Sequence, residues 1–206
     1  MKFEVKQNEL MNAINIANKA VSKNTNIQIH ELIYFETAED RLSLTAFDGE
    51  ITIKTSIPAL VKEEGEMAVK ASLFSNIIRK LPNDTVKVEI KDGKINVRSQ
   101  NSNFNLIAFD YFEKQDLELP DTKPLEIAND KLKRSILQTE FATSMDETKI
   151  ALTGILFELK EGNLNMVALD GYRVSLKQNK IDYVSEYENS EFIIPKRSLM
   201  EWSRII

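Results

Sequence analysis

The sequence contains no cysteine and a single histidine, which removes several kinds of chemistry at once. Without cysteine there is no disulfide, no thiolate metal ligand and no thiol nucleophile, as is common in cytoplasmic proteins. One histidine excludes any metal motif that needs two histidines from this chain. Because His30 stands beside apolar Ile29 and Leu32, we expect it to pack or lie on the surface rather than act as a base. We therefore expect neither a metal site nor a cofactor.

Glycine is scarce, and long apolar runs are missing. The six glycines form no phosphate-cradling loop and no Gly-x-Ser-x-Gly turn. No apolar run approaches the roughly 18 residues that a membrane span needs, and Met1-Lys2-Phe3-Glu4 does not begin a signal peptide. We therefore expect no membrane partner. The net charge of −5 argues against a generally basic nucleic-acid coat, although it leaves room for a locally basic face.

What the chain does contain is an internal repeat. The segment ELIYFETAEDRLSLTAFDGE around Asp48 resembles TGILFELKEGNLNMVALDGY around Asp170, which lies 122 residues further on. Unrelated segments match at roughly one position in fifteen to twenty, and this alignment is far denser. At the same offset, without a gap, identical pairs include Glu4 and Glu126, Leu10 and Leu132, Ile14 and Ile136, Ser22 and Ser144, Ile33 and Ile155, Phe35 and Phe157, Leu42 and Leu164, Ala46 and Ala168. The repeat predicts two copies of one fold, typical of a ring or array.

Periodicity predicts an α+β fold in both copies. Apolar residues at three- and four-residue steps predict helices over 8–21, 72–81, 130–142 and from about Lys196. Alternation predicts strands at 2–5, 32–36, 42–47, 50–57, 86–90, 94–99, 104–108, 125–128, 155–158, 164–169, 172–178 and 192–194.

The proline-containing stretch 117–124 reads as a linker between the copies. We expect a complete first domain over 1–120 and a second over 121–206. If the second copy has three extra loop residues near 186–190, Ile206 aligns with Leu81, and nothing in the second copy matches 82–108. We therefore expect the second domain to lack its last three strands.

Asp48 and Asp170 are the residues most open to a catalytic interpretation. Two carboxylates can do acid–base work, but each of these precedes a glycine at a predicted turn, where aspartate caps the backbone. We favour the structural interpretation. The basic side chains of the predicted helices allow two interpretations as well, a solvated helix face or a phosphate-contacting face.

The opening MKFEV, the helix LMNAINIANKAVS, the hairpin LSLTAFDGEITI and above all GILFE…NMVALDGYRVSL resemble the bacterial sliding clamp, the beta subunit of DNA polymerase III. The resemblance covers essentially the whole chain. It implies the DNA-clamp fold, in which each repeated domain packs two helices on antiparallel sheets, with helices lining a channel and sheets outside. That family has three such domains, of which this chain matches the first and about two-thirds of the second. We therefore expect no third clamp domain within these 206 residues.

The resemblance also implies a partner-peptide pocket on the second domain. It maps to Leu152, Leu169, Gly171, Tyr172, Arg173 and Val174. Such a pocket receives short linear motifs from the polymerase III alpha subunit, the clamp loader and repair polymerases. Leu169 and Tyr172 stand where threonine and histidine are frequent in the family, so the preferred peptide can differ. A purely structural alternative makes Leu152 and Val174 core residues.

Further roles follow from the same resemblance. The family's subunit-interface strand falls on 104–106, with Phe104 and Leu106 as its apolar contacts. A DNA-contacting loop falls on 22–26, where Asn24 replaces a frequent arginine and leaves Lys23 as the expected phosphate contact. The other DNA-binding candidates are basic residues of the helices and loops: Arg79, Lys133, Arg134, Lys149, Lys196 and Arg197.

The function implied is that of a non-enzymatic tether. Two subunits of the full-length protein would form a homodimeric ring around double-stranded DNA, without reading its sequence, and make the replicative polymerase processive. Such a protein is cytoplasmic and associated with the nucleoid. The alternative is an interaction module with the clamp fold that binds peptide motifs and never encircles DNA.

Overall fold

The first two elements follow directly from the sequence pattern. In the computed structural model, which describes residues 1–22, 25–91, 93–109, 124–183 and 185–206, the alternating start forms strand β1 (Lys2–Lys6) and the apolar stripe after it forms helix α1 (Gln7–Ala17). Helix α1 buries Leu10, Ala13 and Ile14 on one face and ends in a 3₁₀ turn, η1 (Asn18–Ala20). The fold divides into two units, Met1–Leu117 and Glu118–Ile206. Their boundary falls outside the described residues.

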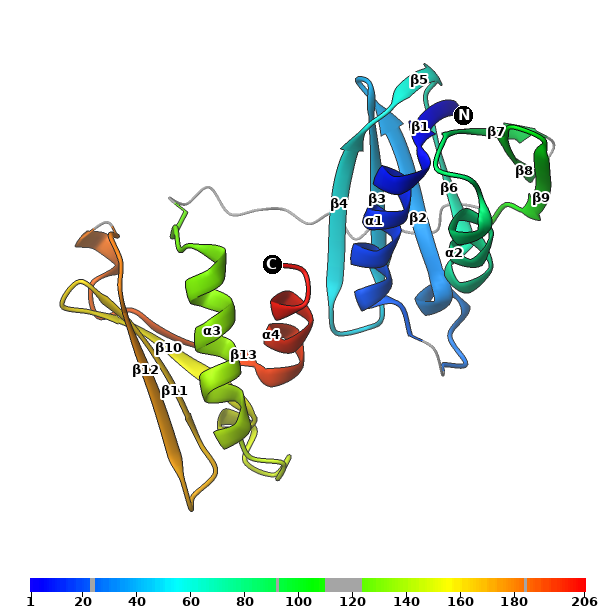
Figure 1. Cartoon of the computed structure of the whole chain (residues 1–206). Helices are drawn as coiled ribbons and strands as arrows, with labels where there is room; N and C mark the ends of the chain where they lie inside the picture. Colours follow the sequence, from blue (N-terminus) through cyan, green and yellow to red (C-terminus); the bar gives the residue numbers. More distant parts are fainter. Residues whose placement is uncertain (23–24, 92, 110–123, 184) are drawn as a thin grey trace. The chain divides into compact units, whose positions relative to one another are not determined.

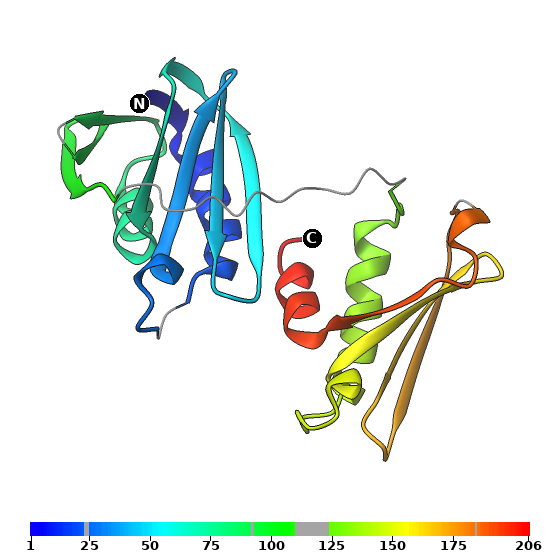
Figure 2. The same ribbon diagram turned by 180° about the vertical axis from the view of Figure 1, so that it is seen from behind.

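Unit 1 contains two antiparallel sheets. One has the strand order β4-β3-β2-β6 and the other β5-β1-β7-β8-β9 (Figure 1). Figure 2 shows the first sheet in front of α1. The remaining elements are η2 (Gln28–Glu31), β2 (Leu32–Ala38), β3 (Arg41–Phe47), β4 (Thr52–Pro58), β5 (Leu60–Glu63), β6 (Gly65–Lys70), α2 (Ala71–Lys80), β7 (Thr85–Lys91), β8 (Lys94–Ser99) and β9 (Ser102–Ile107).

The core of unit 1 lies between these sheets and the two helices. Alternate residues of the strands point inward, so Phe3, Phe35 and Leu44 are fully buried beside α1 and α2. The rings of Phe35 and Phe74 meet edge to face, with centroids 5.1 Å apart, which adds to the burial energy of both. The helices α1 and α2 contact each other on this core. Unit 1 is therefore built around one continuous hydrophobic core.

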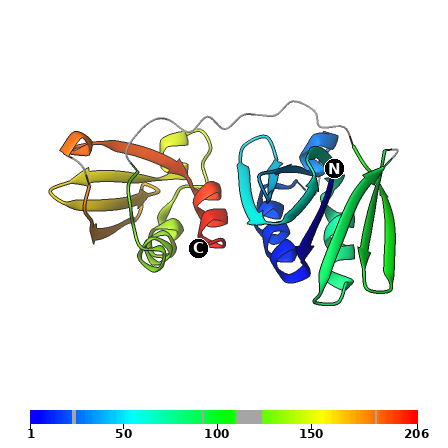
Figure 3. The same cartoon turned by 90° about the horizontal axis from the view of Figure 1, so that it is seen from above.

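Unit 2 repeats the first half of this plan. Its sheet has the order β12-β11-β10-β13, and helices α3 and α4 contact each other and cover that sheet (Figures 1 and 3). A separate core includes Leu132, Ile136, Phe157 and Leu199. The elements are α3 (Asn129–Thr139), η3 (Glu140–Ala142), η4 (Ile150–Thr153), β10 (Gly154–Lys160), β11 (Asn163–Leu169), β12 (Val174–Lys180), η5 (Ser185–Tyr187), β13 (Glu191–Pro195) and α4 (Lys196–Ser203).

The repeat predicted from sequence is present in the structure. The bounds of α1, η1, η2, β2, β3 and β4 recur 122 residues later as those of α3, η3, η4, β10, β11 and β12. The apolar residues that the copies share are core residues in both, since Leu42 and Leu164, Ala46 and Ala168 are all at most 2% exposed. Identity between the copies therefore marks the scaffold.

Three expectations were wrong in detail. Residues 125–128 form no strand, because the matching strand β1 is held by β5 and β7 and the described part of unit 2 has no strand in either place. A strand without a neighbour has no ladder of hydrogen bonds. The strands β5 and β6 were not anticipated from their patterns. Finally, the predicted helices 8–21 and 130–142 end early as α-helices, at Ala17 and Thr139, and finish as 3₁₀ turns.

Among the described residues, no helix combines the length and the apolar character that crossing a membrane would require.

The separate cores predict separate unfolding of the two units. Phe74→Ala removes a fully buried ring from unit 1 and should destabilise that unit by about 3–5 kcal/mol. Phe157→Ala is the matched change in unit 2. The one tryptophan of the chain, Trp202, lies in α4 of unit 2, so its fluorescence reports that unit alone. During thermal unfolding, Phe157→Ala should shift the fluorescence transition, and Phe74→Ala should shift only the remaining circular-dichroism transition. A common shift of both signals in either variant would contradict independent units.

Candidate partner-binding site

The turn between β11 and β12 is fixed by the Asp170 carboxylate. Its Oδ1 accepts the backbone N–H groups of Tyr172 and Arg173 at 2.9 and 3.0 Å. Gly171 takes a φ of 93° there, a conformation that favours glycine. The turn sets the register in which Leu169 pairs with Val174.

Asp170 also holds the Arg173 side chain. Its Oδ2 accepts the Arg173 Nε–H at 2.9 Å, and the guanidinium lies over the ring of Phe141, 5.6 Å from its centroid. The backbone N–H groups of Tyr172 and Arg173 are the main reason why the pKa of Asp170 is lowered, against the opposing effect of desolvation. Arg173 is therefore pinned between a carboxylate and an aromatic face, although its side chain is 57% exposed.

The structure brings the predicted pocket residues to one end of unit 2's sheet. Leu169, Gly171, Tyr172, Arg173 and Val174 follow one another through the turn. Tyr172 is fully exposed, Val174 is 68% exposed and Leu169 is 37% exposed. Side chains this open are not core residues, so the purely structural interpretation of Val174 is wrong.

Leu152 comes from the preceding loop. It lies in η4 and is half-buried, and its carbonyl accepts the backbone N–H of Ser144 at 2.8 Å. The matching bond in unit 1, from Ser22 to His30, has the same length. The loop is thus built alike in the two copies, with leucine in one and histidine in the other.

The same place in unit 1 is filled. His30 packs edge to face on Phe47, with ring centroids 5.3 Å apart, and a Cβ on Gly49 would lie 3.2 Å from the His30 ring. At Gly171, by contrast, a Cβ would meet no described atom within 4 Å. The expectation that His30 is a packing residue is confirmed. Its ring covers in unit 1 the position that is open in unit 2.

The same comparison explains both aspartates. Asp48 Oδ1 accepts the N–H groups of Glu50 and Ile51 at 3.1 and 2.9 Å, as Asp170 does in its own turn. The structural interpretation of Asp48 and Asp170 as turn-capping residues is therefore confirmed. Within the described ranges, no group of three or more histidine, aspartate and glutamate side chains is placed to hold a metal ion.

The sequence pattern did not predict a role for Phe141 at this site. It is 51% exposed in η3 and supports Arg173. Leu137, one turn earlier on the same helix face, is 49% exposed. The repeat could have indicated this residue, because it aligns Phe141 with Lys19. An aromatic residue that is present in only one copy is a poor candidate for the core that both copies share.

The candidate DNA-binding residues are scattered over both units. Lys23 and Asn24 lie outside the described residues. The exposed ones are Arg79 at the end of α2, Lys133 and Arg134 on α3, Lys149 before η4 and Arg197 on α4.

Lys196 is bound within unit 2. Its Nζ lies 2.6 Å from Glu140 Oε2 and donates to the Glu140 carbonyl at 3.0 Å. An ammonium group held this way is less available to a phosphate. Sequence alone did not distinguish Lys196 from its neighbour Arg197.

The candidate interface strand is an edge strand. β9 ends the five-stranded sheet, with Phe104 37% exposed and Leu106 7% exposed. Leu106 belongs to the core of unit 1. Of the two predicted contact residues, Phe104 is the one that offers side-chain surface at this edge.

The lowered pKa of Asp170 predicts an acid transition of the turn. A carboxyl with a depressed folded-state pKa stabilises the fold above its ordinary pKa, and this contribution is lost as the pH falls through the depressed value. The amide proton shifts of Tyr172 and Arg173, followed by NMR, should therefore titrate with a midpoint below the ordinary aspartate range. Asp170→Asn should remove that inflection. A midpoint at or above the ordinary aspartate value would contradict the hydrogen bonding described for the turn.

Comparison with known families gives the same domain order. The family model for the N-terminal domain of the DNA polymerase III beta subunit matches residues 1–118, and the model for the central domain matches residues 126–206. The beta sliding clamp of Bacillus subtilis (strain 168) is 32% identical over 216 residues, which cover 100% of this chain and 57% of that protein. That of Staphylococcus aureus (strain N315) is 31% identical over 225 residues, with the same coverage.

Solved structures agree. The crystal structure of the DNA polymerase sliding clamp from Bacillus subtilis matches with a TM-score of 0.92 at 31% identity, over 100% of this chain and 57% of that one. The Helicobacter pylori beta clamp in complex with carprofen matches with a TM-score of 0.89 at 28% identity, over 100% and 56%. The chain thus spans 57% of the length of the curated relatives. With both units matched in order, the chain belongs to the DNA polymerase III beta subunit family.

Proposed function

We propose that this protein serves as a DNA sliding clamp, which tethers a replicative polymerase to duplex DNA by enclosure and catalyses no reaction. The observation that carries the proposal is the match of both units, in chain order, to the first two domains of the beta subunit family. The relatives named above are sliding clamps by description. The chain spans only 57% of their length, so ring closure, as a homodimer of the full-length protein, is part of the proposal.

Enclosure suits the charge of this protein. A ring that retains DNA topologically needs only weak, sequence-blind contacts, so a chain of net charge −5 can function on DNA. In each unit the two helices share one side of the fold, and Arg79 and Arg134 are exposed on them. We assign the phosphate contacts to this helical side, with Lys23, Lys149 and Arg197 as further candidates. Such a protein belongs in the cytoplasm, at the nucleoid.

The partner site is assigned to the end of unit 2's sheet. Leu152, Leu169, Val174 and the fully exposed Tyr172 supply apolar area, and the immobilised Arg173 can donate hydrogen bonds to a peptide carbonyl. Aromatic and arginine side chains of this kind dominate the energy of protein interfaces. We propose that short linear motifs of the polymerase III alpha subunit, the clamp loader and repair polymerases bind here. The His30 ring, which lies beside Gly49, is the feature by which unit 1 differs from unit 2 at this place.

A second candidate function is that of a peptide-binding module that never surrounds DNA. The observation that favours it is the concentration of exposed apolar side chains on unit 2, including Tyr172, Val174 and Leu176. It predicts peptide binding without topological retention, so the two experiments below separate it from the clamp.

A ring should stay on circular DNA and leave linear DNA. The protein is incubated with a bacterial clamp loader, ATP and nicked circular plasmid, and the complex is isolated by gel filtration. We expect co-elution that survives about 0.5 M salt, because enclosure does not depend on phosphate contacts, and loss of the protein once the plasmid is linearised.

The control is the same plasmid linearised before loading. Equal retention on circular and linear DNA, or release from the circle by salt alone, would show ordinary binding and exclude enclosure for this chain. If enclosure is excluded, peptide binding measured in parallel shows whether the protein is a peptide-binding module or has neither function.

Loss of the Tyr172 ring should weaken peptide binding. A fluorescent peptide from the clamp-binding segment of a polymerase III alpha subunit is titrated with the protein, and anisotropy gives Kd. We expect Tyr172→Ala and Val174→Asp each to raise Kd at least about tenfold, as for central interface residues. Leu73→Ala, which truncates an apolar side chain that is 48% exposed on α2 of unit 1, is the control and should change Kd less than about twofold. Unchanged binding in both pocket variants would move the site elsewhere.

A further inference from the structure

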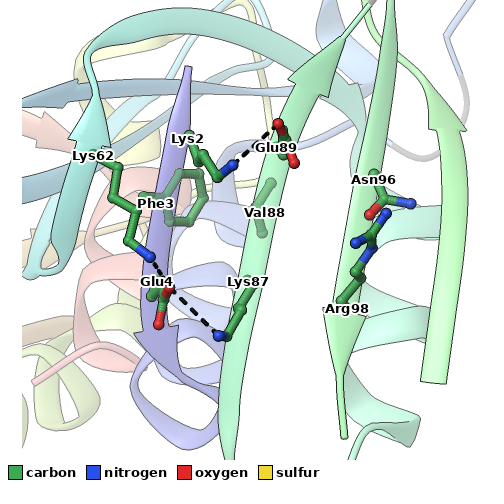
Figure 4. A pocket seen from close by; sticks show the side chains of 9 residues that line it. All are labelled: Lys2, Phe3, Glu4, Lys62, Lys87, Val88, Glu89, Asn96 and Arg98. Atoms are coloured by element: carbon green, nitrogen blue, oxygen red, sulfur yellow. Dashed lines mark hydrogen bonds and ion pairs between the residues drawn. The ribbon is translucent and has the colours of Figure 1, made fainter. Parts of the chain in front are cut away.

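A hollow of about 250 Å³ lies on the outer face of the five-stranded sheet of unit 1. Figure 4 shows it between strand β1 and strand β8, with the side chains of Lys2, Glu4, Lys87 and Arg98 around it. The alternate residues of these strands, such as Phe3, point into the core that carries α1 and α2. The hollow is therefore on the side of the sheet opposite to both helices.

On the left of Figure 4, the hollow is lined by acidic and basic side chains that form ion pairs with one another. Glu4 forms ion pairs with Lys62 and with Lys87, the latter at 3.6 Å, and Lys2 pairs with Glu89 at 3.2 Å. The hydrogen bond from Lys62 is the first cause that lowers the pKa of Glu4, so this carboxyl stays ionised in neutral solution. The lining contains the four cations Lys2, Lys62, Lys87 and Arg98 but only the two carboxylates Glu4 and Glu89. It therefore has two positive charges in excess.

Arg98 carries the unmatched charge. It stands directly opposite Lys87 in the pairing of β7 with β8, an arrangement of like charges that destabilises a sheet. Lys87 is compensated by Glu4, whereas Arg98 forms no ion pair within the part of the chain that the structure describes. Lys87 points toward Glu4 (Figure 4), so Arg98 is the cation at the hollow that a carboxylate from outside would pair.

The β8 side of the hollow is held in place by hydrogen bonds between asparagine side chains. Asn96, the neighbour of Arg98 on the same face of β8, donates from Nδ2 to the side-chain oxygens of Asn103 and Asn105 at 2.6 and 2.8 Å. Asn103 is in turn the strand partner of Arg98. This cross-strand amide cluster limits the conformations of the wall, so a ligand would meet a partly ordered surface.

The charges of the lining favour a protein ligand over a nucleic acid. Duplex DNA presents one negative charge per roughly 1.7 Å, and a run of phosphates laid across the hollow would meet Glu4 and Glu89 as well as the cations. A single carboxylate can pair with Arg98, which forms an ion pair with neither Glu4 nor Glu89. A guanidinium can bind such a carboxylate with two parallel hydrogen bonds.

We propose that this hollow is a docking site for an acidic segment of a partner protein, one of whose carboxylates binds Arg98, beside its cross-strand neighbour Lys87. The site is independent of the peptide pocket of unit 2 and of ring formation.

Titration with a short acidic peptide tests the proposal on the full chain. Acetylated, amidated triglutamate is added to ¹⁵N-labelled protein, and the Nε–H signal of Arg98 and the amide signal of Lys87 are followed by NMR. We expect saturable shifts at both residues. Arg98→Gln should weaken the binding at least about fivefold, since it removes a charge-assisted pair of hydrogen bonds.

The matched control is Lys94→Gln. Lys94 lies on the same strand and is exposed, but it does not line the hollow, and its replacement removes the same charge. We expect it to change the affinity less than about twofold. Equal weakening by Lys94→Gln and Arg98→Gln would reveal non-specific attraction and overturn the site.

Two further probes distinguish the source of the anion. Inorganic phosphate that shifts the same signals as strongly as triglutamate would indicate an adventitious ion only. A 12-base-pair duplex that displaces triglutamate from Arg98 would reassign the surface to nucleic acid. Either result, or the absence of saturable shifts, overturns the proposal, and none of them bears on retention by circular DNA.

Discussion

The fold depends on one local constraint that is used twice, the turn in which an aspartate carboxylate accepts the two N–H groups that follow the glycine. Asp48 and Asp170 both do this. Because the register of a hairpin follows from its turn, these two carboxylates fix which residues of β3 and β4, and of β11 and β12, lie opposite each other. A slip by one residue would move every core side chain of the strand to the outer face.

Once the turn is fixed, the residues around it can diverge without changing the scaffold. In unit 1 the space beside Gly49 is filled by His30 on Phe47. In unit 2 the position that matches His30 is occupied by Leu152, and the space beside Gly171 is open. The proposed partner site is thus the place where one copy has lost the side chain that covers the turn in the other. A site made in this way requires no new element of secondary structure.

The sequence predicted what local pattern and repetition can determine. The three strands β10, β11 and β12 and the helix α3 were located because apolar periodicity and the 122-residue offset agree there. Residues 125–128 have the pattern of a strand but not its neighbours, and pairing is a tertiary property. The same holds for Phe141: its contact with Arg173 joins a helix end to a hairpin turn, and no spacing in the sequence encodes that proximity. Helices and strands were predictable where the local sequence pattern determines them. The candidate site was predictable only where the two copies of the repeat differ in sequence.

The distribution of charge within each unit also bears on how such a protein could hold DNA. Lys196 is held by Glu140, whereas Arg79, Lys133 and Arg134 are exposed on the helices. Each phosphate contact adds to the affinity and to the salt sensitivity of binding, so contacts from a few such residues would be weak at physiological salt. Weak contacts are nevertheless what sliding requires, because each must break as the protein moves. Weak contacts of this kind are therefore compatible with the proposed retention by enclosure, in which the ring and not the affinity of the contacts would keep the protein on DNA.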